Sequence, residues 1–289
     1  MSSKNFSIDP VTHLLQAKGA KYKVDTSNYI TTKNNTKFSK GQCDALIIHY
    51  TAGRDGLSSA RHLADANIKA SAHLVVNKDG SVIQVVPFDT IAWHAGRSFY
   101  DGRKGYNKFS LGIELDNPGI LTPAQNGFVS WFGKSYKPEN VIQAVHRNEK
   151  SPRYWHTFTE DQILVCEEIS DLLIQTYGLK QILGHEEISP GRKQDPGPAF
   201  PLDKMRDKIL GDTREVDTDD DNKKPKKGKV AASRLNIRNA PSTTGTKVAL
   251  PLGGGKPVTI LEEKGDWIKV STEIQGWVSK QYIEITETE

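Results

Sequence analysis

The chain has 289 residues, of which 36% are hydrophobic, and a formal net charge of +4. This length favours two domains, and the lack of any apolar run of about eighteen residues argues against a membrane span. Lys and Arg are spread evenly instead of forming a basic patch, so a nucleic-acid-binding protein is not expected.

The first forty residues are polar, and we treat residues 1–40 as an N-terminal extension. They lack the apolar core of a secretory signal. Cys43 and Cys166 lie far apart without the spacing of metal ligands. Cys166 is expected to be a buried thiol, and a disulfide between the two is not expected.

Residues 41–211 alternate predicted strands with predicted helices, which indicates an α/β fold with a mixed central sheet flanked by helices. Strands are predicted at residues 45–50, 72–77, 81–86 and 110–115. An Asp-Gly turn joins the second of these strands to the third. Helices are predicted over residues 58–68 and from Thr159, which forms a capping box with Gln162, to residue 177.

Residues 212–229 read DTREVDTDDDNKKPKKGK and predict a solvated linker rather than a ligand-binding tail. After this linker, residues 230–289 consist of short β-runs separated by Gly and Pro, a pattern typical of a small all-β barrel. The predicted strands are residues 235–238, 257–262, 267–271 and 276–279.

Three polar side chains follow apolar segments in the manner of metal ligands. His49 ends the strand at 45–50, His185 follows the apolar run 181–184, and Asp195 comes later in a loop rich in Pro and Gly. Two imidazoles and a carboxylate leave one position for water, as in a catalytic zinc site. Spacing alone is a weak signal, because His and Asp are common at loop ends.

Five blocks of sequence follow one another in the order of a known family. They read IIHYTAG, SAHLVVNKDGSVIQVVP, AWHAGRSFYDG, NKFSLGIELDNPG and GHEEISPGRKQDPGPAFP, between residues 47 and 201. They resemble the type 2 N-acetylmuramoyl-L-alanine amidases, the AmpD- and AmiD-like zinc amidases with the peptidoglycan-recognition-protein fold. The resemblance implies hydrolysis of the amide bond between N-acetylmuramic acid and L-alanine in peptidoglycan or muropeptides.

The resemblance assigns the site residues position by position. It implies that His49, His185 and Asp195 are ligands of Zn²⁺. Glu114 falls on the family's catalytic glutamate, which would move a proton from water to the departing nitrogen. Lys193 falls on its catalytic lysine, which would stabilise the oxyanion.

Four further residues are predicted to bind substrate. Trp93 is expected to act as a platform and Asn117 as a hydrogen-bonding group. His94 would line the site without being a ligand, and Arg192 completes this group. His73 is expected to be structural or close to the site.

Residues 119–158 are longer than in compact members of the family and rich in aromatic side chains. They would either wall the substrate groove or form a packed surface excursion, and the sequence leaves both open. Four other histidines lie in polar surroundings and are expected at the surface or at caps: His13, His62, His146 and His156.

Residues 233–285 resemble a bacterial SH3 domain through LNIRNAPS, GDWIKV and GWVS. The resemblance implies a module that binds the cell wall or a peptide. Trp277 and Tyr282 are candidate ligand contacts, and Trp267 is expected to pack in the core.

Three other functions compete with the zinc amidase. They are a non-catalytic peptidoglycan-binding receptor on the same fold, an adaptor centred on the SH3-like domain, and a zinc amidohydrolase for another substrate such as an acyl amino acid. All metal and catalytic positions of the family are present, which favours the amidase. We expect a monomer that acts on the cell wall in the periplasm or outside the cell. A cytoplasmic location stays open, because no export signal is visible.

Overall fold

The protein is described by a computed structural model that covers residues 3–211, 227–238, 240–243, 248, 251–264 and 267–272. The chain divides into two compact units, Met1–Glu215 and Val216–Glu289. Within the described ranges, no helix has both the length and the apolar character that crossing a bilayer requires.

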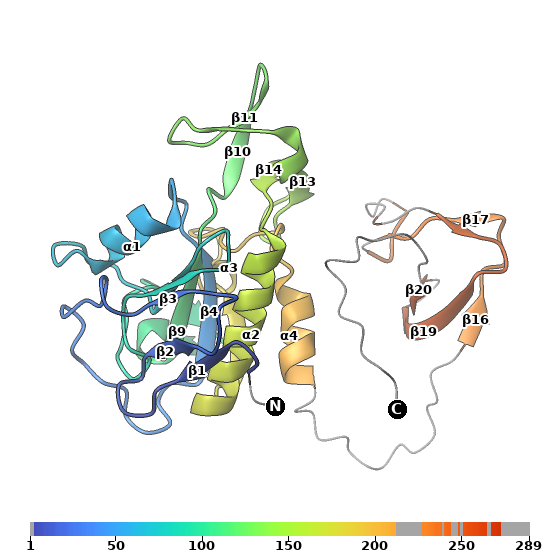
Figure 1. Ribbon diagram of the computed structural model, residues 1–289. Coiled ribbons are helices and arrows are strands. Elements are labelled where there is room, and N and C mark those ends of the chain that lie inside the picture. Colours follow the sequence, from blue (N-terminus) through green and yellow to red (C-terminus); the bar gives the residue numbers. More distant parts are fainter. Residues whose placement is uncertain are drawn as a thin grey trace, which may run out of the picture. The chain divides into compact units, whose positions relative to one another are not determined.

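A six-stranded mixed sheet in the order β15-β4-β9-β5-β6-β3 forms the centre of the first unit (Figure 1). Its strands are β3 (Val24–Asp25), β4 (Ala45–Tyr50), β5 (Leu74–Val76), β6 (Val82–Gln84), β9 (Ser110–Leu115) and β15 (Gln181–Gly184). The strands β15, β4, β9 and β5 are parallel, so their carboxyl ends meet at one edge. β6 pairs antiparallel with β5 and confirms the predicted hairpin.

Helices cover both faces of this sheet, as the predicted fold class requires. The helices α2 (Glu160–Tyr177) and α4 (Leu202–Leu210) pack on the face that carries Leu46 and Ile48. The capping box of Thr159 and Gln162 at the start of α2 is confirmed. The opposite face carries α1 (Gly56–Ala64) and the short α3 (His185–Ile188). α1 ends four residues before the predicted end at 68, because Asp65 and Ile68 close a turn.

The polar N-terminal residues pack onto this unit instead of standing apart from it. They form the hairpin of β1 (Phe6–Ile8) and β2 (Leu15–Ala17). Phe6, Leu15 and Tyr22 are buried in the same core as α2. Cys166 is fully buried in that core, as predicted, and both cysteines are free thiols.

Residues 119–158 fold into a second, antiparallel sheet in the order β12-β11-β10-β14-β13. Its elements are β10 (Ile120–Ala124), β11 (Gly127–Val129), β12 (Ser135–Tyr136), the 3-10 turn η2 (Pro138–Asn140), β13 (Val141–Val145) and β14 (Pro152–His156). Figure 1 shows β10 and β11 projecting from the α/β body. A small hairpin of β7 (Phe99–Tyr100) and β8 (Arg103–Lys104) precedes the turn η1 (Tyr106–Lys108).

The described part of the second unit is all β. β16 (Lys227–Lys229), β19 (Pro257–Lys264) and β20 (Trp267–Ser271) form one sheet, and β17 (Arg234–Leu235) pairs with β18 (Leu252–Gly253). β16 occupies the last three residues of the predicted linker, because it pairs with β19. The rest of that linker, the predicted strand at 276–279, Trp277 and Tyr282 lie outside the described residues. Trp267 is half-buried at the start of β20.

Candidate metal centre and active-site cavity

His49 and Glu114 lie beside each other near the carboxyl ends of β4 and β9. The two residues are direct register partners in this parallel pair. Alternation along β4 sends Leu46 and Ile48 toward α2 and therefore sends His49 to the opposite face. Glu114 reaches the same face, because its neighbours Ile113 and Leu115 point toward α2.

His185 and Asp195 reach this place from the next strand and its following loop. β15 pairs with β4 and ends at Gly184, so His185 starts α3 at the same edge of the sheet. The loop then returns, and the backbone N–H of Glu186 donates to the carbonyl oxygen of Asp195 at 2.9 Å. This bond holds the Asp195 segment against the start of α3.

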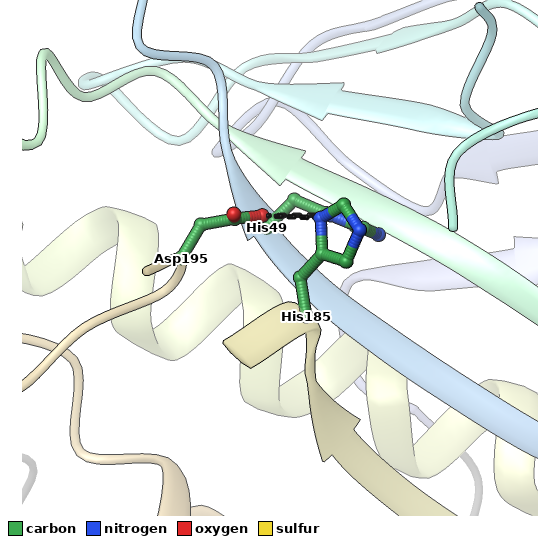
Figure 2. A group of neighbouring side chains, drawn as sticks. All are labelled: His49, His185 and Asp195. Atoms are coloured by element: carbon green, nitrogen blue, oxygen red, sulfur yellow. Dashed lines mark hydrogen bonds and ion pairs between the residues drawn. The ribbon is translucent and has the colours of Figure 1, made fainter. Parts of the chain in front are cut away.

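The side chains of His49, His185 and Asp195 converge on one point (Figure 2). The Nδ1 atoms of the two histidines and Oδ2 of Asp195 are each 2.9 Å from the other two. All three residues are buried. These are the three residues that the sequence predicted as metal ligands.

The outward nitrogens of both imidazoles have partners that fix the proton positions. His94 Nε2 lies 3.2 Å from the Ser110 carbonyl oxygen, which only accepts, so His94 donates there and its Nδ1 is an acceptor. His49 Nε2, 3.0 Å away, donates to that Nδ1. His185 Nε2 donates to the Ala95 carbonyl at 3.1 Å. Both histidines therefore direct an unprotonated Nδ1 at the centre of the cluster.

This donor set fits a metal ion. Two nitrogen lone pairs and a carboxylate oxygen cannot hydrogen-bond to one another, so their convergence in a buried place calls for a cation. Zinc bonds of about 2.0 Å in tetrahedral geometry separate ligand atoms by about 3.3 Å, close to the spacing found. Burial, followed by the nearby His185, lowers the pKa of His49 to about 4, which keeps its imidazole neutral at pH 7.

A cavity of about 330 Å³ opens beside the cluster, and its wall includes His185, Asp195, Glu114 and Lys193. The Glu114 Oε2 atom is buried and has no hydrogen-bond partner among the described residues. Burial, followed by the charge of Asp195, raises the pKa of Glu114 well above its usual range, and Lys193 opposes this. The cavity thus brings a carboxyl group and a lysine side chain to the candidate metal centre.

Three of the four predicted substrate contacts line this cavity: Trp93, His94 and Arg192. Trp93 is 38% exposed and is anchored through its backbone, which exchanges two hydrogen bonds with Ser71. His94 supports His49 from behind. The Arg192 guanidinium donates to the Ala95 and Arg97 carbonyls, so it ties two loops together at the rim.

Asn117, the fourth predicted substrate contact, lies apart from this cavity wall. Asn117 is fully buried and does not line the cavity. Its side-chain amide donates to the Thr157 carbonyl at 3.0 Å and accepts from the Gly119 backbone at 2.8 Å. These hydrogen bonds stabilise the turn between β9 and β10.

The expectation that His146 and His156 lie at the surface or at caps is wrong. His146 is 1% exposed, and its Nε2 lies 2.6 Å from Oε2 of Glu186, the residue that follows the ligand His185. The same oxygen accepts from the Gly197 backbone at 3.0 Å, and Oε1 pairs with Arg147 at 2.8 Å. Glu186 and His146 are buried and Arg147 is exposed, and together they join the 119–158 sheet to the loop that carries Asp195.

Sequence reasoning also missed part of the cavity wall: Tyr50, Thr51, Ala52, Leu63, Ala70, Ser71 and Gln194. Thr51 and Ala52 directly follow β4, which carries His49, and this position after the strand end was the signal that could have identified them. His73 is structural. It accepts from the Gly112 backbone and donates to the Thr90 carbonyl, both at 2.9 Å.

Comparison with known proteins places this geometry in context. The family model described as N-acetylmuramoyl-L-alanine amidase matches residues 39–198, and that of the bacterial SH3 domain matches residues 233–284. The 1,6-anhydro-N-acetylmuramyl-L-alanine amidase AmpD of Escherichia coli K12 is 33% identical over 49% of this chain and 59% of its own length. N-acetylmuramoyl-L-alanine amidase AmiD of the same strain is 29% identical over 67% of this chain and 63% of its own.

A solved complex of E. coli AmiD with anhydro-N-acetylmuramic acid-L-Ala-D-gamma-Glu-L-Lys is 28% identical, with 63% of each chain covered and a TM-score of 0.43. The chain spans about three fifths of the length of the curated relatives it matches. The amidase model alone covers more than half of the chain. With its α/β sheet and its C-terminal bacterial SH3 domain, this chain belongs to the N-acetylmuramoyl-L-alanine amidase family.

Proposed function

We propose that this chain hydrolyses the amide bond between N-acetylmuramic acid and L-alanine in peptidoglycan or muropeptides. The observation that carries the proposal is the buried cluster of His49, His185 and Asp195 beside a cavity that Glu114 and Lys193 also line. Membership of the amidase family supports the bond type. The names of AmpD and AmiD support a muramyl substrate.

The proposed cofactor is Zn²⁺, held by His49, His185 and Asp195. Two neutral imidazoles and one carboxylate form the donor set of catalytic zinc sites, which leave a further position open. When bound, the ion lowers the pKa of a water molecule to about 7 and polarises the amide carbonyl. His94 and the Ala95 carbonyl would keep the two imidazoles oriented, as outer partners of metal ligands do.

Glu114 is the proposed general base and then general acid. Its buried Oε2 is without a partner in the described structure, so it is free to take a proton from the attacking water. The same oxygen would return the proton to the alanine nitrogen as the amide bond breaks. Lys193 on the cavity wall would donate to the oxygen that becomes negative in the transition state. Trp93, partly exposed at this wall, is the proposed platform for the muramoyl ring or the peptide.

The test is the digestion of a defined muropeptide by zinc-loaded protein, with products identified by mass spectrometry. We expect a free muramoyl saccharide and a peptide that begins with L-alanine, together one water heavier than the substrate. Glu114→Gln keeps the shape but removes the base, so it should retain zinc and lose turnover by about 10²–10⁴-fold. Glu160→Gln, an exposed carboxylate at the start of α2, is the matched control.

Two outcomes would contradict this reading. Tight muropeptide binding without cleavage by zinc-loaded protein would replace the enzyme with a receptor. Undiminished turnover in Glu114→Gln would remove Glu114 from the mechanism.

The C-terminal unit is proposed to bind the cell wall or a peptide, on the strength of the bacterial SH3 family match. A tethered binding module raises the effective concentration of substrate at the catalytic unit. The full chain should therefore sediment with insoluble peptidoglycan even when Glu114→Gln blocks cleavage. Failure to co-sediment would argue for a peptide ligand instead.

A further inference from the structure

An exposed tryptophan stands at the end of the sheet formed by residues 119–158. Trp131 lies in the turn between β11 and β12 and is 78% exposed, the most exposed large aromatic side chain among the described residues. Its indole Nε1–H nevertheless donates to the Ala52 carbonyl oxygen at 2.8 Å. The hydrogen bond therefore fixes the position of the Trp131 ring, while most of its surface stays exposed to solvent.

Contacts within the turn that contains Trp131 stabilise its conformation. Ser130 and Lys134 close the turn through a backbone hydrogen bond of 2.9 Å, and Gly133 adopts the left-handed conformation with φ of 83°. Phe132 meets Trp131 edge to face at 5.4 Å, and the Arg54 guanidinium lies over the Phe132 ring. Trp131 buries little of its surface, so its packing contributes little to folding, and its hydrogen bond to Ala52 holds an aromatic ring that stays open to solvent.

The acceptor of the indole is itself part of the active-site cavity. Ala52 lines the cavity, three residues after the ligand His49. Its backbone has φ of 48°, which non-glycine residues seldom adopt, and its carbonyl oxygen accepts from Trp131 in this conformation. Trp131 is therefore hydrogen-bonded to a residue of the cavity wall, although it does not itself line the cavity.

The chemistry of the exposed ring limits what it can bind. Its one polar hydrogen is used by Ala52, so the ring offers an uncharged aromatic face and no hydrogen-bonding group. The C–H face of a pyranose sugar matches such a surface, because its weakly positive hydrogens meet the negative face of the ring. A stem peptide, with amides and carboxylates, needs donors and acceptors that Trp131 lacks.

We propose that Trp131 is a binding platform for a sugar of the glycan chain next to the muramoyl residue whose amide enters the cavity. The proposal rests on the proposed amidase function and deepens it, because it makes a glycan longer than one sugar the preferred substrate. Trp131 then acts as a specificity residue that contacts substrate away from the cleaved bond.

The test compares substrates that differ only in the number of sugars. A single N-acetylmuramoyl unit and a tetrasaccharide, both with the same stem peptide, are digested by wild type, Trp131→Ala and Trp131→Phe. The readout is the ratio of kcat/KM on the tetrasaccharide to kcat/KM on the single sugar. Trp131→Ala should lower this ratio roughly tenfold through KM, as expected for loss of one stacking aromatic, and Trp131→Phe should restore most of it.

Phe99→Ala is the matched control, because Phe99 is also an exposed aromatic (53%) but lies in the β7–β8 hairpin, paired with Lys104 and not with a cavity residue. It should leave the ratio unchanged. An equal loss on both substrates in Trp131→Ala would show that the residue only supports Ala52 and would overturn the proposal. A loss that depends on stem-peptide length and not on sugar number would overturn it as well.

Calorimetry separates this proposal from the amidase function. Binding of the same two substrates is measured in a Glu114→Gln background, with and without Trp131→Ala, so no turnover is needed. If wild type cleaves nothing, the proposed function fails, while a weaker tetrasaccharide affinity in the double variant still supports the platform. If Glu114→Gln binds the tetrasaccharide with the same affinity with and without Trp131→Ala, the platform is refuted even if wild type is an active amidase.

Discussion

Replacing Glu186 by Ala tests whether the contacts of Glu186 with His146 and Arg147 support the loop that carries Asp195. Glu186 is 2% exposed and accepts from His146, Arg147 and the Gly197 backbone. The substitution leaves the buried His146 imidazole without its partner, while the Arg147 guanidinium keeps Glu187 and Asp203. A buried polar group left without its hydrogen-bond partner costs about 1–3 kcal/mol.

This loss can be converted to a melting temperature. In a unit of this size each kcal/mol shifts Tm by about 2–4 °C, so Glu186→Ala should lower Tm by about 2–12 °C. Glu186→Gln keeps the acceptor oxygen and should lose less. Near-UV circular dichroism is a suitable assay, because the buried Trp155 stacks on His146 with ring centroids 5.6 Å apart.

Glu139→Ala is the control, since Glu139 forms an exposed pair with Lys137 at 3.7 Å. Such surface pairs contribute about 0–1 kcal/mol. The measurements are made in excess zinc and in chelator, so that metal binding and folding are read separately. If Glu186→Ala has the same Tm as Glu139→Ala both in excess zinc and in chelator, Glu186 does not support the Asp195 loop and the reasoning is refuted.

Three further outcomes follow from the site. Gly112→Ala would place a Cβ 2.6 Å from the His94 ring, so it should displace the partner of His49 and weaken metal binding by about 10–100-fold in a chelator competition; unchanged affinity would contradict this. Burial lowers the pKa of His73 to about 4, so the unfolded chain binds more protons between pH 6.5 and 4. Stability should therefore fall as the pH drops through this window, by about 2 kcal/mol at pH 5 from His73, and a flat denaturation midpoint from pH 7 to 5 would refute it. Chelation should abolish hydrolysis and lower Tm, since a ligand at 100 times its Kd stabilises by about 2.7 kcal/mol; a Tm indifferent to zinc would exclude a metal centre.

The sequence predicted the central sheet and the metal cluster well, because their signals are local. The strand at 110–115 alternates strictly, which alone indicates that Glu114 faces away from Ile113 and Leu115. The positions of His49 and His185 at strand ends could be recognised in the same way. Their convergence required the family resemblance, since no spacing along the chain reports which strands become neighbours.

The errors arose where long-range packing decides the role of a polar residue. His146 lies in a polar stretch, yet it is buried because Glu186, forty residues later, supplies a carboxylate. Asn117 is a polar residue that was predicted to contact substrate, but its side-chain amide forms hydrogen bonds to Thr157 and Gly119 after β9. Phe6 and Leu15 are too sparse among polar neighbours to reveal a pattern, although both enter the core.

The pairing of β15 with β4 has a consequence for how the protein would acquire the proposed metal during synthesis. His49 and His185 are 136 residues apart, and Asp195 follows later still. A nascent chain therefore carries one ligand long before the other two leave the ribosome, and no tight site exists until β15 docks. Binding of the proposed metal would then stabilise a contact that closes a long loop of the chain. The proposed ion would therefore bind late, and its binding would couple the completion of the sheet to the formation of the active site.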